Sequence, residues 1–424
     1  MNASIVLLAA QLRVLTLADA VSTAEGNQPT LQQVRAQSDA AQARVDQARA
    51  PLLPQVTGSA FYQRTTANFI FRPGFAPTTT QPPPPTFRTS NYFNFGLTLS
   101  QYIWDFGQTT GRWRAAQATA EAQEATVQAT GLEVILNVRI MYFAARAQKA
   151  LVEGTRATLA NQEQHLQQIT SFVRVGTRPE IDLAQARTDR ANALVGVINA
   201  ENAYEAAKAA LNQAMGIAAP TDYDVEDATI DPVEGEDQPT DTLLEEAVRS
   251  RPDLAGLERQ LDAQRRTVAS VKGGYWPTLN FATNFNSASI QLDTLRWNWN
   301  AQVNLNWSLF NGLLTRSQIR EEQATLRVVE AQKSSQLLAV RLEIEQARLA
   351  VRAARAALGA SEEALTNASE RLRLAEGRYQ TGVGNGIELS DAQVALASAV
   401  TQKIQAEYNL ATARARLLKS LGRR

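Results

Sequence analysis

Hydrophobic and polar positions alternate with a period of two in two stretches of the chain. In the longer stretch, Asn, Gln and Ser hold the positions between the apolar residues Trp297, Trp299, Val303, Leu305, Trp307 and Leu309. Phe93, Phe95, Leu97 and Leu99 repeat the alternation. This pattern predicts β-strands. Aromatics on one face and uncharged amides on the other, over about a dozen residues, are typical of a wall between lipid and water. The alternative is a half-buried soluble sandwich, whose strands usually have about 5–6 residues.

A period of seven runs through the second half of the chain. The repeating apolar positions are Leu337, Ile344, Val351, Leu358, Leu365, Leu372 and Tyr379. Three residues after the first six come Val340, Ala347, Ala354, Ser361, Ala368 and Ala375. Such a repeat predicts a left-handed coiled coil, in which the small partner residues let the helices approach closely. A helix of about 70 residues reaches about 105 Å, which is longer than a single globular domain needs.

The same pattern occurs twice, at an offset of 206 residues that pairs Leu166 with Leu372, Gly176 with Gly382 and Gly216 with Gly422. The pattern of each copy predicts a helix of about 24 residues, two strands, a helix of about 70 residues, a glycine turn and a helix of about 38 residues. The first repeat covers residues 15–216 and the second covers 242–424. An acidic connector, residues 217–241, has no Lys or Arg and is expected to be solvated rather than part of a core.

Composition removes several classes of function. With 42 basic and 42 acidic residues, nothing suggests a nucleic-acid partner. The absence of Cys excludes disulfides and thiolate metal sites, and the only histidine, His165, is expected at the surface of a polar helical run. We therefore expect no catalytic constellation, no metal and no cofactor. Residues 1–14 resemble a partial secretory signal segment, and an ordinary buried N-terminal segment is the alternative.

Four strands per chain cannot close a barrel, and open strand edges cannot lie in lipid. Because bacterial barrels begin at about eight strands, the wall must be shared among several chains. In each copy the long helix leaves the strands and ends at the glycine turn, and the following helix returns only part of the way. The lengths therefore predict a hollow cylinder of helices attached to a barrel, with the connector at mid-height and both turns at the far end.

This order of parts resembles the TolC-type outer-membrane efflux and secretion channels over about residues 15–422. The resemblance is carried by Trp104-Asp105-Phe106-Gly107, Leu309-Phe310-Asn311-Gly312, Val175-Gly176, Thr381-Gly382, Pro54, Pro277, Leu211 with Gly216, and Leu417 with Gly422. It implies a mainly α fold with membrane β structure. Internally duplicated coiled-coil hairpins would form an α-barrel, and four β-strands per chain would contribute to a shared transmembrane β-barrel.

The resemblance also implies a homotrimer in the outer membrane of a Gram-negative bacterium, in contact with outer-membrane lipid and extending into the periplasm. Its partners would be a periplasmic adaptor (membrane fusion) protein and an inner-membrane pump, in tripartite efflux or type I secretion. The cargo (drug, metal ion or protein), the particular adaptor and pump, and the resting state of the channel stay open. A soluble or periplasmic coiled-coil scaffold is the alternative, but it has no use for the alternation at Trp297–Leu309.

Residue by residue, the resemblance implies a periplasmic gate in which Asp182 links to Tyr379 while Glu388 and Asp391 form an acidic ring. Many relatives have a basic residue where this chain has Gly384, so one closing contact is in doubt. The adaptor-contact tips would be Val175, Gly176, Thr177, Arg178, Thr381, Gly382, Val383 and Gly384. The membrane-facing strand residues would be Phe93, Phe95, Leu97, Leu99, Trp297, Trp299, Val303 and Leu305.

Local helix chemistry offers simpler roles for several of these residues. Thr177 with Glu180, and Asn385 with Glu388, have capping-box spacing, so Glu388 could merely satisfy a backbone N–H. Asp182 could complement the helix dipole, and Tyr379 could be only a packing residue. N-caps of the long helices are expected at Asp105 and Asn311, and C-caps at Gly176 and Gly382.

Overall fold

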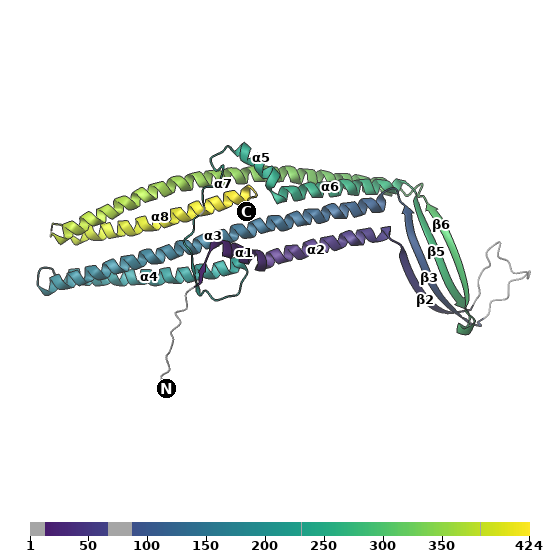
Figure 1. Ribbon diagram of the computed structural model, residues 1–424, viewed down its shortest axis with the longest axis horizontal. Helices are drawn as coiled ribbons and strands as arrows, with labels where there is room; N and C mark the ends of the chain where they lie inside the picture. Colours follow the sequence, from purple (N-terminus) through teal and green to yellow (C-terminus); the bar gives the residue numbers. More distant parts are fainter. Residues whose placement is uncertain (1–12, 67–86, 230, 382) are drawn as a thin grey trace, which may run out of the picture. The chain divides into compact units, whose positions relative to one another are not determined.

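The computed structural model describes residues 13–66, 87–229, 231–381 and 383–424 (Figure 1). Its helices are α1 (Leu17–Asn27), α2 (Pro29–Arg49), α3 (Gln108–Arg174), α4 (Glu180–Met215), α5 (Thr240–Ser250), α6 (Pro252–Lys272), α7 (Leu314–Gln380) and α8 (Gly386–Ser420). Its strands are β1 (Arg13–Leu15), β2 (Gln55–Thr65), β3 (Ser90–Trp104), β4 (Tyr223–Val225), β5 (Thr278–Ser289) and β6 (Arg296–Asn306). Short 3₁₀ turns, η1 (Ala50–Leu52), η2 (Gly273–Tyr275) and η3 (Leu292–Thr294), complete the described elements.

The predicted order of elements is present in both copies. The long helices α3 and α7 have 67 residues each, and the helices after the turns, α4 and α8, have 36 and 35 residues. The chain forms two compact units, which are described separately. Residues 1–38, 123–257 and 332–424 make the helical unit, and residues 39–122 and 258–331 make the sheet unit.

In the helical unit, α3 lies beside α4 and α7 lies beside α8, so each copy forms a helical hairpin (Figure 1). The seven-residue repeat of α7 lies in the packed core, because Ile344, Val351, Leu372 and Tyr379 are buried and Leu337 and Leu358 pack against the cluster that holds Ile344 and Val351. The partner positions Val340, Ala347, Ala354 and Ala375 are buried with them. The sequence therefore predicted both the helices and the stripes by which they pack.

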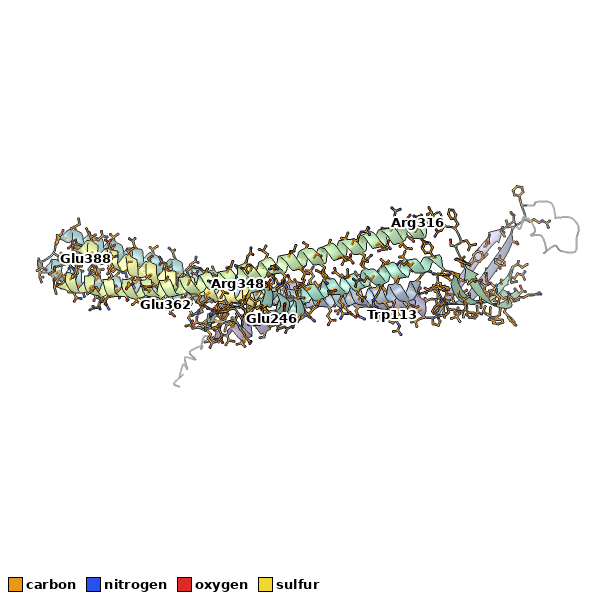
Figure 2. The ribbon with its side chains drawn as sticks, turned by 90° about the horizontal axis from the view of Figure 1, so that it is seen from above. Trp113, Glu246, Arg316, Arg348, Glu362 and Glu388 are labelled. Carbon is orange, nitrogen blue, oxygen red and sulfur yellow. The ribbon has the colours of Figure 1, made fainter. Side chains whose placement is uncertain are left out.

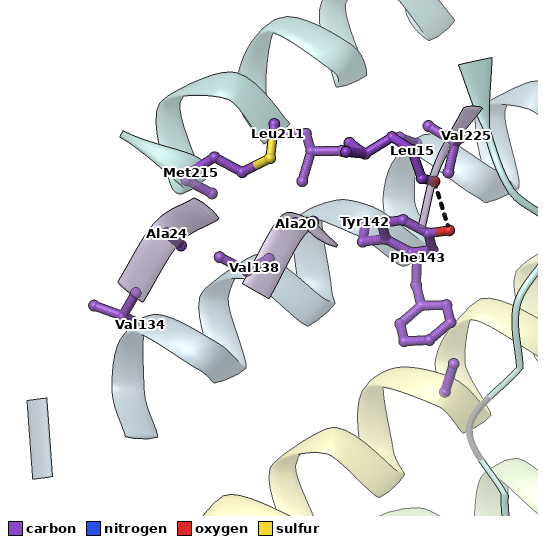
Figure 3. Close-up of a cluster of buried hydrophobic side chains, with 13 residues drawn as sticks. Leu15, Ala20, Ala24, Val134, Val138, Tyr142, Phe143, Leu211, Met215 and Val225 are labelled. Carbon is purple, nitrogen blue, oxygen red and sulfur yellow. Dashed lines mark hydrogen bonds between the residues drawn. The ribbon is translucent and has the colours of Figure 1, made fainter. Parts of the chain in front are cut away.

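The connector contributes to the core of the helical unit, which corrects the expectation of a solvated segment. Its β4 pairs in parallel with β1, with Leu15 opposite Val225, and both side chains are buried. Figure 3 shows these residues packed with Tyr142, whose hydroxyl donates to the backbone carbonyl of Leu15 at 3.2 Å. The apolar Val225 decides the position of the segment, because burying its side chain is favourable while the neighbouring acidic residues stay at the surface. Residues 1–12 of the expected signal segment lie outside the described residues.

Further along the connector, Val233 packs among Val340, Ile344 and Leu417, and the carboxylate of Glu236 is buried. Glu236 forms ion pairs with Arg355 and Arg414. A charge can be removed from water in this way when it is paired and hydrogen-bonded. One acidic residue of the connector, Glu236, therefore holds the segment against the helices, which its acidic composition did not predict.

A second ionic network, centred on the buried Arg251, joins α6, α7 and α8. The guanidinium of Arg251 bonds to Asp253 at 2.7 Å, to Glu343 at 2.8 Å and to the carbonyl of Ser420 at 2.9 Å. Lys419 pairs with Glu343 at 2.8 Å. Burial alone would raise the pKa of Asp253 and Glu343, but Arg251 holds the pKa of Asp253 below its ordinary value, and Lys419 and Arg251 do the same for Glu343. The network therefore favours the ionised carboxylates in the folded state.

This network predicts a loss of stability in acid. The pKa values of Asp253 and Glu343 in the folded chain lie below the ordinary values of 3.8 and 4.5. The two carboxylates therefore contribute their full stabilisation above the ordinary pKa values, and this stabilisation is lost as pH falls through the lowered pKa values of the folded chain. We expect the melting temperature of the wild-type protein to fall below about pH 4.5. The difference in melting temperature between wild type and Glu343→Gln should shrink over the same range. Thermal melts followed by circular dichroism test this; a difference independent of pH would contradict it.

The sheet unit contains four antiparallel strands in the order β2-β3-β5-β6. Their register places Leu97 beside Phe285 and Phe285 beside Trp299, so the apolar positions of separate strands share one face. The opposite face carries cross-strand amide pairs, such as Asn284 with Asn300. The strands have 11, 15, 12 and 11 residues, which is the length expected of membrane-wall strands and not of a typical soluble sandwich.

The ends of the strands lead directly into helices. Asp105 accepts hydrogen bonds from the backbone N–H of Gly107 and Thr109 at 3.1 and 2.6 Å, so the expected N-cap is confirmed. Asn311 does not cap α7 in the same way, because its amide donates to the hydroxyl of Thr315 at 2.7 Å. No helix in the described parts of the chain is both long and apolar enough to cross a membrane.

Candidate functional site

The candidate site is the pair of turns that end the two helical hairpins. At the first turn, Gly176 adopts a positive φ of 77°, which L-residues with a side chain rarely tolerate. Its N–H donates to the carbonyl of Val173, and the N–H of Thr177 donates to that of Phe172, both at 3.0 Å. This is the Schellman arrangement of a helix C-cap, so the expected role of Gly176 is confirmed.

The second turn closes by different contacts. The N–H groups of Val383 and Gly384 both donate to the carbonyl of Arg378, at 3.0 and 2.9 Å. A Cβ added to Gly384 would lie 3.0 Å from the carbonyl carbon of Arg378, so the turn folds back tightly on the end of α7. A long basic side chain at this position would require the turn to shift. Gly382, expected to contact the adaptor and to form a C-cap, lies outside the described residues.

The capping-box spacing is used at one turn only. The side chain of Asn385 accepts a hydrogen bond from the N–H of Glu388 at 2.7 Å, which caps α8. At the first turn, the hydroxyl of Thr177 donates back to the carbonyl of Phe172, and α4 has no side-chain cap. Thr177 is therefore part of the C-cap of α3, which corrects the prediction of a capping box there.

Between the hairpins, Tyr379 packs with Ile169, Ala186, Leu389 and Ala392 and is only 5% exposed. The guanidinium carbon of Arg178 lies 4.7 Å from the centroid of the Tyr379 ring. Arg178 also pairs with Asp182, with 3.9 Å between Nη1 and Oδ2. No hydrogen bond joins Asp182 directly to Tyr379 in this described region. The structure therefore brings the two expected gate residues together through Arg178.

His165 borders the same cluster, and its ring centroid lies 5.5 Å from that of Tyr379. It is half-buried, so the expectation of a plain surface histidine is wrong. Burial lowers the pKa of His165, although Asp189 and Asp182 oppose the shift, and the imidazole is uncharged at neutral pH. Burial raises the pKa of Tyr379, with Arg178 lowering it and Asp182 raising it, so the phenol stays protonated. Arg178 is therefore the cation that faces the Tyr379 ring.

The two residues of the expected acidic ring differ in their surroundings. Glu388 pairs with Arg378 across the second turn, with 3.2 Å between Oε1 and Nε. Asp391 is exposed one turn further along α8 and has no ion-pair partner among the described residues. Arg378 therefore neutralises part of the negative charge at this turn, and Asp391 keeps its charge facing solvent.

Large apolar side chains are exposed at both turns. Val175, Ile181, Val383 and Ile387 are 70%, 74%, 73% and 72% exposed. Thr177 and Thr381 are exposed beside them, and Figure 2 labels Glu388 at this end of the hairpins. Apolar side chains that gather on a surface with charged neighbours are typical of a protein-interaction site. Ile181 and Ile387 occupy equivalent positions in the two repeats, which the sequence offset already indicated.

The eight expected membrane-facing residues share one face of the sheet. Phe95 lies beside Ser287 and Ser287 beside Trp297, and Phe281 lies beside Val303. Six of the eight are exposed, and Phe93 and Leu99 are half-buried. The rings of Phe285 and Trp297 stack at 6.1 Å on the same face. Exposed aromatic and aliphatic side chains on a single sheet face are what a lipid-facing surface requires.

The role of Arg178 is the feature of the site that sequence reasoning missed. We expected this residue to contact a partner at the tip, and the structure places it against Tyr379. Its spacing of four residues from Asp182 on a helical path is a signal for an ion pair. Its approach to Tyr379 could not be found from spacing, because the two residues come from different repeats.

A family model described as outer membrane efflux protein matches residues 20–217 and 243–423 of the chain. Toluene efflux pump outer membrane protein TtgF of Pseudomonas putida is 27% identical over 334 residues, which cover 77% of this chain and 68% of that protein. Outer membrane protein TolC of Escherichia coli is 24% identical over 418 residues, covering 93% of this chain and 79% of that one.

Solved structures have the same fold. The outer membrane protein VceC of Vibrio cholerae superposes with a TM-score of 0.80 at 18% identity, covering 96% of each chain. The CmeC outer membrane channel of Campylobacter jejuni has a TM-score of 0.80 at 20% identity, covering 96% of this chain and 85% of that one. At these identities the likeness concerns the fold.

Proposed function

The chain belongs to the outer membrane efflux protein family, and from this membership we propose that it is the exit duct of a tripartite assembly. In that assembly a periplasmic adaptor would meet the turns of the hairpins, and an inner-membrane pump would supply the energy. The family is one of channels and not of enzymes, and efflux across the Gram-negative outer membrane is its role. The duct would serve efflux or type I secretion, and no particular cargo, adaptor or pump is part of this proposal.

The observation that carries the proposal is a four-stranded sheet with one apolar face and two open edges. β2 and β6 each have a single neighbour in the sheet. Unpaired backbone groups are costly in hydrocarbon, so a sheet of this kind is stable in lipid only when its edges meet other strands. Pairing β2 of one copy with β6 of the next would close a ring. Three copies would provide twelve strands, above the minimum of about eight for a bacterial barrel.

The turn cluster supports a gate within the duct. Tyr379, Arg178 and Asp182 form a chain of contacts from the second repeat to the first. Breaking these contacts would let the two hairpins separate at their ends without disturbing the buried stripes further along. Three copies of Glu388 and Asp391 would surround the opening, and this negative charge would concentrate cations.

The exposed apolar residues of the turns are the proposed contact with the adaptor. Val175 and Ile181 come from one turn, and Val383 and Ile387 from the other. A partner with apolar helix ends could cover all four, while Arg178 and Glu388 lie beside this surface and would orient the approach.

Cross-linking tests the shared wall directly, because the chain has no native Cys. Ser59 on β2 is replaced by Cys, and is combined in turn with Asn298→Cys, Asn300→Cys and Gln302→Cys on β6. Treatment of outer-membrane fractions with a bis-maleimide should produce dimers and trimers on denaturing gels. Thr98→Cys with Asn284→Cys is the matched control; these residues are paired within one chain and should yield monomers only. Monomers throughout the β2–β6 panel would refute a shared wall.

A further inference from the structure

The end of the sheet next to the helices contains a cavity that the channel function does not use. The cavity has a volume of about 590 Å³ and lies between the end of β3, the first turns of α3 and the last turns of α6. Trp104, Phe106, Thr110, Arg114 and Arg266 are among the residues that line it. All of them belong to the sheet unit. The cavity therefore combines aromatic, hydroxyl and guanidinium groups at one place.

Close packing of α3 on α6 fixes the two arginines at the same level. A Cβ added to Gly111 would lie 2.7 Å from the Cβ of Ser270, and the hydroxyl of Ser270 donates to the carbonyl of Gln108 at 2.7 Å. α3 begins at the sheet and α6 ends there, so the helices run in opposite directions. One turn further from the sheet, Arg114 follows Gly111 on α3 and Arg266 precedes Ser270 on α6.

The two arginines have donors available for an anion. Arg114 is exposed and has no ion-pair partner in the described part of the chain. Arg266 uses Nε and Nη2 on a single oxygen of Asp262, at 2.9 and 2.8 Å. The two helical turns nearest the sheet contain no acidic residue on either helix, and Asp105 is the one acidic residue among those that line the cavity. Two guanidinium groups therefore line the cavity beside a single carboxylate, that of Asp105, which already accepts hydrogen bonds from the backbone N–H groups of Gly107 and Thr109.

The other wall of the cavity continues the apolar face of the sheet. Trp104 lies beside Leu279 in the register and is 60% exposed. Its ring meets that of Phe106 edge-on at 6.1 Å, and Phe106 stacks on Trp276 at 5.4 Å. Exposed aromatic side chains at the end of lipid-facing strands are typical of the membrane–water boundary. A ligand held here would therefore have its charged part between the arginines and its apolar part along the sheet.

We propose that this cavity binds the phosphate headgroup of an anionic glycerophospholipid. Guanidinium groups bind phosphate oxygens through paired, charge-assisted hydrogen bonds, and the hydroxyl of Thr110 would provide another donor. A lipid fits the whole site because the adjoining Trp104 surface would contact its acyl chains. A soluble anion would use the arginines and leave that surface exposed. The inference rests on the outer-membrane location of the family, and it adds a ligand that channel activity does not require.

The test uses the full-length chain, purified in nonionic detergent as the intact oligomer. Native mass spectrometry measures binding of phosphatidylglycerol and, separately, of phosphatidylcholine with the same acyl chains. We expect the wild type to prefer phosphatidylglycerol by about tenfold. Arg114→Gln should reduce the preference, and Arg114→Gln with Arg266→Gln should remove it. Arg114→Lys, which keeps the positive charge, should retain part of the preference for phosphatidylglycerol.

Arg112→Gln is the matched control, because Arg112 has the same charge on the same helix and does not line the cavity. It should leave the preference unchanged. Equal binding of the two lipids by the wild type, or an unchanged preference in the double variant, would overturn the proposal. Displacement of phosphatidylglycerol by millimolar inorganic phosphate would also overturn it, since the site would then be a soluble-anion site. Circular dichroism of each variant verifies folding, and the Ser59 cross-links report the shared wall independently.

Discussion

Asp182→Ala combined with Tyr379→Phe should raise the conductance of the channel severalfold in planar lipid bilayers. The double variant removes the carboxylate that pairs with Arg178 and so weakens the contact of Arg178 with the Tyr379 ring, and it also removes any direct aspartate–tyrosine link. The effect is amplified by symmetry if three copies open together. A loss of about 1 kcal/mol per copy would then shift the opening equilibrium by about 3 kcal/mol, on the order of a hundredfold.

Single variants separate a direct aspartate–tyrosine link from the contact through Arg178. Tyr379→Phe keeps the ring, so Arg178 still stacks on it and the conductance should change little. Arg178→Ala removes the cation from both neighbours and should open the channel almost as much as the double variant. Arg187→Ala, an exposed arginine further along α4, is the matched control and should leave conductance unchanged. Wild-type conductance in both the double variant and Arg178→Ala would reject the gate.

Arg251→Met should destabilise the folded chain by about 3–5 kcal/mol, because it leaves Asp253 and Glu343 without their buried partner. The side chain of Arg251 is only 6% exposed, and those of Asp253 and Glu343 are 27% and 35% exposed, so water replaces only part of the lost hydrogen bonds. Urea unfolding followed by circular dichroism measures the loss. Glu343 retains Lys419, and the acid sensitivity predicted for this network should therefore be reduced and not abolished.

Arg341→Met is the comparison variant for Arg251→Met, because it breaks an exposed ion pair of α7. Arg341 pairs with Asp241 at 2.9 Å, but the two side chains are 56% and 77% exposed. An exposed pair contributes about 0–1 kcal/mol, because solvent screens the charges and replaces the lost bonds. A similar loss of stability in Arg251→Met and Arg341→Met would show that burial does not decide the strength of the network.

Local periodicity was sufficient to predict the repeated parts of the fold. A period of seven identified the buried stripe of α7, and a period of two identified the shared apolar face of β3 and β6. Both depend on backbone geometry, which determines the side of a helix or strand on which each residue lies. The cap formed by Asp105 was predictable for the same reason, since its bonds reach only Gly107 and Thr109.

Predictions failed where a residue serves a distant segment. The connector was expected to be solvated because of its acidic composition, yet Val225 and Val233 are buried by helices from both repeats. His165 was expected at the surface because its neighbours are polar, yet it packs against Tyr379, more than 200 residues away. Asn311 is of a residue type that commonly caps helices, but its side chain is bonded to the side chain of Thr315 instead.

The sequence by itself determined the duplication, the element types, the faces of the strands and the two turns that end the hairpins. These properties follow from repeated local spacing, and each copy supports the other. Only the tertiary structure decided that Arg178 contacts Asp182 and Tyr379 together, and that Arg114 and Arg266 line one cavity. Such contacts join side chains from different helices, so they depend on how the helices pack, which periodicity along one helix does not specify. At Gly111 and Gly384 that packing depends on the absence of a single Cβ.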